Sequence, residues 1–230
     1  MAKPIYLVGG GKGGVGKSLV SMALIDYLRQ RQEAVTLIEC DNSNSDVWKA
    51  YKEAVPSEII SLDDIDGWIR LVNCCDGVPN NTVVINTAAR NNQGINKYGA
   101  TLNSTLAELQ HTLVIFWVIN RQRDSLELLW DCMAALPNAR VHVVRNTYFG
   151  PASRFELYQG SEVRTAVEGK GGQSVDFPDL ADRVADDLNS QRLTIAQAAK
   201  DLPIGNRAEL LRWRGEVAKM LDQVILHEPA

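Results

Sequence analysis

A glycine-rich segment near the N-terminus constrains the fold of this chain more than any other feature. It fits the pattern G-x-x-x-x-G-K-[ST] and consists of Gly11, Lys12, Gly13, Gly14, Val15, Gly16, Lys17 and Ser18. An apolar run at 5–8 precedes it, and a stretch of helical periodicity at 18–31 follows it. A strand, a glycine loop and a helix in this order are typical of a loop that wraps its backbone N–H groups around phosphate. The segment therefore predicts a phosphate site at the end of the first strand.

The residue types of this loop suit the binding of a nucleoside triphosphate. Glycines let backbone N–H groups approach phosphate oxygens without obstruction by side chains, and the following helix directs its positive dipole end at the same place. We expect Lys17 to reach the β- and γ-phosphates and the Ser18 hydroxyl to bind Mg²⁺. The alternative is a glycine-rich turn without a ligand, which the flanking strand and helix disfavour.

Apolar runs of strand length alternate with stretches of helical period along the rest of the chain. This alternation predicts the α/β class, with a doubly wound, mainly parallel sheet and helices on both faces. We expect one nucleotide-binding domain over 1–230, with a flexible loop at 169–172 and a closing helix at about 207–226. The predicted strands are 5–8, 34–40, 82–86, 113–119, 141–146 and 174–178, and the other predicted helices are 18–31, 63–75, 101–109 and 125–136.

Composition excludes several classes of protein. The formal net charge of -4 argues against a basic coat for nucleic acid, and no apolar run is long enough to span a bilayer. The four cysteines form no CxxC pair, and no secretory leader is recognisable at the N-terminus. These features predict a cytoplasmic protein with reduced thiols.

The loop contains a second lysine, Lys12, in the sequence KGGVGKS. In this it resembles the deviant Walker A loop of the ParA/MinD family. The resemblance implies ATP/ADP and Mg²⁺ as cofactors and a nucleotide-sandwich homodimer in which Lys12 crosses to the partner's nucleotide. A second cation at the phosphates could also neutralise charge that develops during phosphoryl transfer. The alternative is that Lys12 only adds positive charge to its own loop.

Family members carry Asp-x-Asp after the second strand and a further Asp at the end of a later strand. Here Glu39 and Asp41 occupy the first pair, and Asn86 occupies the later position. The resemblance implies that Asp41 orients the attacking water near the metal, although DNSNSD at 41–46 is also good turn chemistry. It therefore implies a catalytic set of Lys12, Lys17 and Asp41. Asn86 would join Ser18 and Asp41 at the metal, and its lack of charge predicts weak metal binding or slow turnover.

Two further positions match the part of the family pattern that contacts the base. Asn146 ends a predicted strand, as does the adenine-contacting asparagine of the family, and Pro178 lies in a segment, 177–180, that resembles the loop closing over the base. An asparagine after a strand is also an ordinary turn residue. The predicted cofactor-binding set is therefore the whole loop from Gly11 to Ser18 together with Asn146 and Pro178.

The resemblance implies a slow ATPase that acts as a molecular switch in plasmid or DNA partition or in conjugative transfer, similar to the StbB- or TraL-like members. A protein partner would stimulate hydrolysis. The last helix could bind DNA non-specifically through its basic residues, or it could present a solvated face. The tail at 226–230 lacks the basic amphipathic character of a membrane anchor. Two alternatives are a nucleotide-binding scaffold without efficient hydrolysis and an ATP-dependent small-molecule ligase of the same superfamily.

Overall fold

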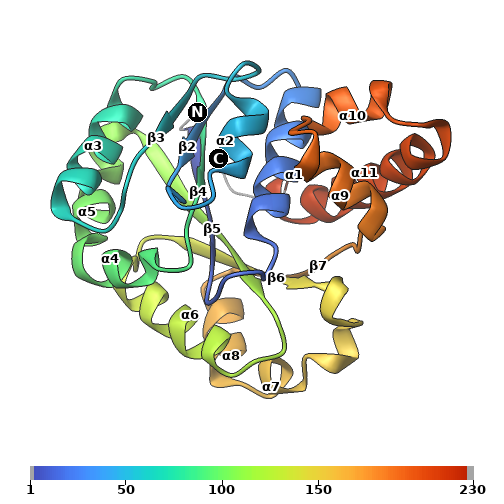
Figure 1. The fold of residues 1–230 in the computed structure, drawn as a ribbon. Coiled ribbons are helices and arrows are strands. Elements are labelled where there is room, and N and C mark those ends of the chain that lie inside the picture. Colours follow the sequence, from blue (N-terminus) through green and yellow to red (C-terminus); the bar gives the residue numbers. More distant parts are fainter. Residues whose placement is uncertain (1–2, 227–230) are drawn as a thin grey trace.

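The structure, a computed structural model, describes residues 3–226 and contains a seven-stranded sheet surrounded by helices (Figure 1). The strands are β1 (Lys3–Gly10), β2 (Val35–Glu39), β3 (Ser57–Ile59), β4 (Thr82–Asn86), β5 (His111–Ile119), β6 (Arg140–Asn146) and β7 (Ser174–Phe177). The helices are α1 (Lys17–Gln30), α2 (Asp46–Tyr51), α3 (Ile65–Asp76), α4 (Asn91–Tyr98), α5 (Ala100–Leu109), α6 (Asp124–Ala135), α7 (Glu156–Gln159), α8 (Glu162–Gly169), α9 (Asp182–Ser190), α10 (Ile195–Asp201) and α11 (Ile204–Ile225). Two 3-10 turns, η1 (Thr147–Phe149) and η2 (Ala152–Arg154), follow β6.

The strand order brings the polar strand ends together at one edge of the sheet. The order is β3-β2-β4-β1-β5-β6-β7, and every pair is parallel. β1 lies between β4 and β5, with Val8 level with Asn86 on one side and Phe116 on the other. Because parallel strands share a direction, the segments after β1, β2, β4 and β6 all leave from the same edge. The predicted doubly wound α/β fold is confirmed.

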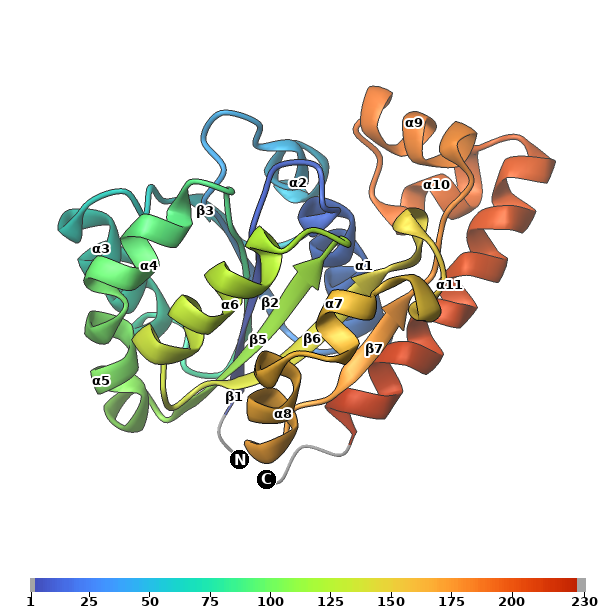
Figure 2. The same ribbon diagram turned by 90° about the horizontal axis from the view of Figure 1, so that it is seen from below.

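Alternate side chains of each strand enter two cores, one on each face of the sheet. In β1, Tyr6 and Val8 pack with α1, α2, α9, α10 and α11, whereas Ile5 and Leu7 pack under α3 to α6 and α8. Figures 1 and 2 show these two groups of helices on opposite sides of the sheet. Burial on both faces explains why the strands read as continuous apolar runs.

Several elements differ from the expectations drawn from sequence patterns, because α4 and the helices from α7 to α10 lie outside the predicted helices. β3 is a three-residue edge strand with largely exposed side chains, too short for its alternation to be recognised. α2 spans six residues directly after a turn-rich run, so the turn signal conceals it. The closing helix, predicted to start at 207, begins at Ile204, because Pro203 supplies the extended entry and its fixed φ suits a helix start.

The predicted loop at 169–172 is instead a hydrogen-bonded turn that closes α8. The Gly171 N–H donates to Glu168 O at 3.0 Å, and the Gly172 N–H donates to Val167 O at 2.9 Å. Gly172 is buried, and a Cβ there would collide with the carbonyl of Val141. Close approach of the turn to β6 therefore requires glycine at this position.

The four cysteines are free thiols, as expected from their spacing, and Cys75 packs into the core beside Trp68. Between residues 3 and 226, no helix combines the length and the apolar character that crossing a bilayer requires. The tail that argued against a membrane anchor lies outside the described residues from position 227 onward.

Candidate phosphate-binding site

The glycine-rich loop connects the central strand β1 to α1 at the carboxyl edge of the sheet. Gly14 and Gly16 have φ values of 75° and 103°, in a backbone region that residues other than glycine rarely adopt. Above Gly13 and Gly14, a Cβ would meet no atom within 4 Å. The loop therefore turns sharply and leaves its outer side open to a ligand.

The first turn of α1 leaves its backbone N–H groups without a side-chain cap. Its N-cap residue is Gly16, which has no side chain, and the turn contains no acidic residue. Uncapped N–H groups and the positive end of the helix dipole together favour an anion at this point. The described residues thus provide a backbone cradle for phosphate.

Lys17 lies across the inside of this loop. Its side chain is buried, and Nζ donates to the carbonyl of Lys12 at 2.8 Å. Burial lowers the pKa of Lys17 to about 8, although the charge of Asp41 acts in the opposite direction. A buried ammonium gains much from a nearby anion, because it has lost most of its hydration. The Lys17 site is therefore suited to phosphate.

Lys12 points elsewhere. Its Nζ forms an ion pair with Asp124 Oδ2 at 2.6 Å, and Asp124 is the first residue of α6. Both side chains are partly exposed, and the contact lowers the pKa of the Asp124 carboxyl. Exposed pairs of this kind contribute little to stability because water competes for both charges. The two lysines of the loop therefore occupy separate environments, one buried at the cradle and one at the surface.

A buried polar network lies next to the loop, between the ends of β2 and β4. Asn86 Nδ2 donates to Glu39 Oε1 at 2.8 Å, and Asn86 Oδ1 accepts from Ser21 Oγ at 2.8 Å. Glu39 also accepts from the N–H groups of Asp41 and Trp48. Glu39, Asn86 and Ser21 are all completely buried. The longer arm of Glu39 thus brings a carboxyl group directly against position 86, where the family pattern has an acid.

Burial raises the pKa of Glu39 to about 7, despite the opposing effect of its N–H donors. A carboxyl that holds its proton more tightly in the folded chain adds stability below its unfolded pKa and loses that contribution as the pH rises through the folded pKa. We therefore expect the stability of the wild type, relative to Glu39→Gln, to fall by about 2–3 kcal/mol between pH 5 and pH 8. Urea unfolding of both proteins at the two pH values measures this difference. A difference independent of pH would contradict the raised pKa.

Asp41 joins this network through its backbone N–H, and Ser18 lies one helical turn before Ser21 in α1. Asp41 Oδ1 accepts from Ser43 Oγ at 2.6 Å and from the N–H groups of Ser43 and Asn44, so it organises the turn after β2. Its charge also acts on buried Lys17. Ser18 is partly exposed in the first turn of α1, and its hydroxyl makes no hydrogen bond with the described residues. Asp41 therefore has the turn role expected as the alternative, and its carboxylate is still close enough to the glycine-rich loop to act on Lys17.

Asn146 lies against the loop, whereas Pro178 lies beside the last helix. Asn146 Nδ2 donates to the Val15 carbonyl at 2.9 Å, and its Oδ1 accepts from the Tyr148 N–H at 3.1 Å. The Pro178 carbonyl accepts from Trp213 Nε1 at 2.8 Å. Asn146 thus positions the loop from β6, and Pro178 is anchored to α11.

The loop fits a nucleotide phosphate chain, because a backbone cradle, an uncapped helix and a desolvated lysine converge there. Within residues 3–226, no group of three or more His, Cys, Asp or Glu side chains is arranged to hold a metal ion. A cation here would therefore take phosphate oxygens and water in addition to the Ser18 hydroxyl, which is the usual coordination of Mg²⁺. Asn86 is enclosed by Glu39 and Ser21 and is less open to a ligand than Ser18.

The CobQ/CobB/MinD/ParA nucleotide binding domain family matches residues 6–146, more than half of the chain and all of the loop. The chain belongs to this family. The resemblance to ParA/MinD proteins is thereby confirmed, and the match covers both the loop and the buried network.

Relatives extend the similarity over nearly the whole chain. Protein MobD of Acidithiobacillus ferrooxidans is 66% identical over 228 residues, which cover 99% of this chain and 100% of MobD. Protein TraL of Escherichia coli is 25% identical over 242 residues, covering 96% of this chain and 98% of TraL. The MinD cell division protein of Aquifex aeolicus has a similar structure, with a TM-score of 0.55, 14% identity, and coverage of 99% and 98% of the two chains. The similarity to MinD supports the fold.

Sequence patterns missed two residues that contact the predicted site. Asp124 pairs with Lys12 from more than one hundred positions away, and nothing in its local sequence indicates this. Ser21 follows Lys17 by one helical turn, and a polar residue on the buried side of a helix is a signal that could have revealed it.

Two of the four basic residues of the last helix are paired with acidic side chains. Arg214 forms a two-pronged pair with Asp26 of α1, and Arg212 pairs with both Glu209 and Glu216. Pairing on the same surface weakens the field that a DNA backbone would meet. These contacts favour the solvated-face alternative for α11 over non-specific DNA binding.

Proposed function

We propose that this protein is an ATP- and Mg²⁺-dependent molecular switch that pairs face to face with a second copy when ATP is bound. The main support for this proposal is that the two lysines of the loop lie in different environments. Lys17 is buried at the cradle, whereas Lys12 is partly exposed and pairs with Asp124. One lysine is placed for its own phosphate, and the other is free to be redirected toward a partner's phosphate.

Within one protomer, the loop amides and Lys17 would hold the phosphates and Ser18 would hold the metal. Bound Mg²⁺ supplies charge neutralisation at the phosphate oxygens. Asp41, next to Lys17, would orient the attacking water, and Asn146 would fix the loop from β6 and approach the base. Pro178 would close over the base from the segment anchored to α11.

Lys12 would act between protomers. Its present partner, Asp124, is exposed, so exchanging that pair for a more negative phosphate is favourable. Two phosphate chains buried at one interface require additional cations, and Lys12 from each protomer would provide them. ATP would therefore stabilise the dimer, and loss of the γ-phosphate would weaken it.

Hydrolysis would be slow. At position 86 the carboxylate of the family pattern is replaced by an amide, and the nearest carboxyl belongs to Glu39. Since Glu39 has a pKa of about 7, it carries only part of a negative charge at neutral pH. We propose that Asn86 and Glu39 together support the metal's water shell, with less charge than an aspartate would provide.

The biological setting we propose is the transfer or mobilisation of DNA. It rests on the TraL match and on the MobD match, which spans all of MobD. A protein partner would stimulate turnover, as the resemblance to ParA/MinD proteins implies.

Asn86 also favours one rival function, a nucleotide-binding scaffold that does not hydrolyse ATP. Phosphate release measured with and without Mg²⁺ separates the two. The switch predicts slow, Mg²⁺-dependent release that disappears in Lys17→Ala and falls in Asp41→Ala. Nucleotide binding without release under any of these conditions would favour the scaffold.

Nucleotide binding is expected to take up protons in mildly alkaline solution. The free Lys17 has a pKa of about 8, and a bound phosphate would raise it. The affinity for ATP is therefore highest below pH 8, where Lys17 is protonated, and it declines as the pH rises above this value. Calorimetry at pH 8 in buffers of different ionisation enthalpy should show uptake of about half a proton per ATP. Uptake of no proton would show that Lys17 does not contact the phosphates.

A further inference from the structure

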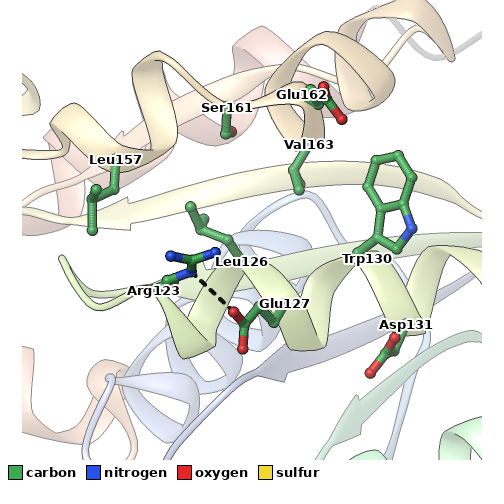
Figure 3. A pocket seen from close by; sticks show the side chains of 9 residues that line it. All are labelled: Arg123, Leu126, Glu127, Trp130, Asp131, Leu157, Ser161, Glu162 and Val163. Carbon is green, nitrogen blue, oxygen red and sulfur yellow. Dashed lines mark hydrogen bonds and ion pairs between the residues drawn. The ribbon is translucent and has the colours of Figure 1, made fainter.

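A cavity lies between α6 and the segment formed by α7 and α8. Its volume is about 510 Å³. Figure 3 shows Leu157 and Val163 pointing from that segment toward α6, where Leu126 and Trp130 face them. We call this cavity the α6–α8 groove.

The floor and walls of the groove are apolar and only partly covered. Leu126 and Val163 are buried at its base, whereas Trp130 is 48% exposed and Leu157 is 57% exposed. An exposed apolar patch in a concave site is typical of a protein–protein contact, and tryptophan is among the residues that contribute most to the energy of association. The groove is thus shaped to receive an apolar side chain.

The rim of the groove is negatively charged. Glu127, Asp131 and Glu162 line it, and Arg123 is the one basic residue among the lining side chains. Arg123 Nε donates to Glu127 Oε1 at 3.0 Å, so this pair is neutral. Asp131 and Glu162 make no ion pair with other described residues, and Figure 3 shows both pointing outward from the apolar side chains. The charge left at the rim belongs to these two carboxylates.

We propose that the α6–α8 groove binds a basic peptide segment of another protein, with one aromatic or leucine side chain in the groove and lysine or arginine residues beside it. The charge of the rim decides the choice of occupant, since basic flanks complement Asp131 and Glu162 and acidic flanks would be repelled. A second copy of this chain, which is acidic overall with a net charge of -4, suits the rim less well.

A random 16-residue peptide library on phage, panned against the full chain without nucleotide, tests the proposal directly. Each round includes counter-selection on the double variant Trp130→Ala/Leu157→Ser. We expect enrichment of peptides that combine an aromatic residue or leucine with neighbouring lysine or arginine. Calorimetry with the enriched peptide should show affinity that falls at least tenfold in the double variant and in Asp131→Lys/Glu162→Lys, and that weakens with added salt.

Matched variants separate a groove effect from a general effect on the surface. Leu211 of α11 is 50% exposed, similar to Leu157, so Leu211→Ser controls for loss of an exposed leucine. Glu108→Lys on α5 controls for charge reversal at an exposed site. Both should bind the peptide as the wild type does, and circular dichroism should show all variants folded.

Three results would overturn the proposal. The first is no enrichment over the counter-selected variant, and the second is enrichment of acidic peptides. The third is self-association of the nucleotide-free wild type, seen by light scattering and abolished by Trp130→Ala, which would assign the groove to a second copy. Because the selection contains no nucleotide, none of these results depends on whether the proposed ATP switch is correct.

Discussion

Lys17→Ala is expected to abolish ATP binding at concentrations where the wild type is saturated. Lys17 is buried at the cradle, and burial has removed most of the hydration of its ammonium group. A bound phosphate would therefore be a strong partner for this charge, and alanine cannot replace it. Removing one partner of such a buried charge contact costs about 2–5 kcal/mol, which corresponds to a loss of affinity of roughly 30-fold or more. Isothermal calorimetry with ATP and Mg²⁺ measures the change.

Lys17→Met provides the matched control for this prediction. Methionine keeps most of the apolar stem and removes only the charge, so it should lose ATP binding to the same extent. Stability toward urea should not fall in Lys17→Met, because a desolvated ammonium is no longer buried. An affinity within about threefold of the wild type in Lys17→Met would contradict the phosphate role of this lysine.

Lys12→Ala is expected to eliminate the ATP-dependent dimer while the protomer still binds ATP. Lys12 contacts Asp124 through exposed atoms and does not enter the cradle occupied by Lys17. Its loss should therefore leave folding and nucleotide affinity nearly unchanged. Light scattering after size exclusion should show the wild type at twice the mass of one chain with ATP and Mg²⁺, and Lys12→Ala at the mass of one chain.

The second Lys-Gly-Gly segment supplies the control for this experiment. Lys170 is exposed in the turn after α8, so Lys170→Ala removes a lysine from the same tripeptide without touching the loop. It should dimerise with ATP as the wild type does. Dimerisation of Lys12→Ala to the wild-type extent would show that this lysine does not act between protomers.

Local sequence was sufficient to predict the parts of the fold in which each residue's neighbours lie nearby in the chain. The loop from Gly11 to Ser18, the strands buried on both faces and the long helices all carry a periodic or conformational signal. β3 and α2 carried none, because three and six residues are too few for a pattern to emerge. Their positions depend on pairing with β2 and packing on α1, which only the assembled sheet provides.

The candidate site likewise combines residues with a local sequence signal and contacts between distant parts of the chain. Lys17 and Ser18 follow from the loop motif, but the surroundings that set their chemistry come from distant strands. Position 86 could be recognised as an unusual Asn, yet its bond to Glu39 was not visible, because it joins two strands 47 positions apart. The same applies to the pair between Lys12 and Asp124. Contacts across parallel strands leave no local trace in the sequence.

A crystal structure of this protein with ATP and Mg²⁺ would show directly whether Lys12 acts between protomers. We predict a dimer in which Lys12 has left Asp124 and its Nζ lies within hydrogen-bonding distance of a phosphate bound to the other protomer, while Lys17 contacts the phosphates of its own. A structure with ATP bound in which Lys12 remains paired with Asp124 and no second protomer faces the loop would contradict this prediction.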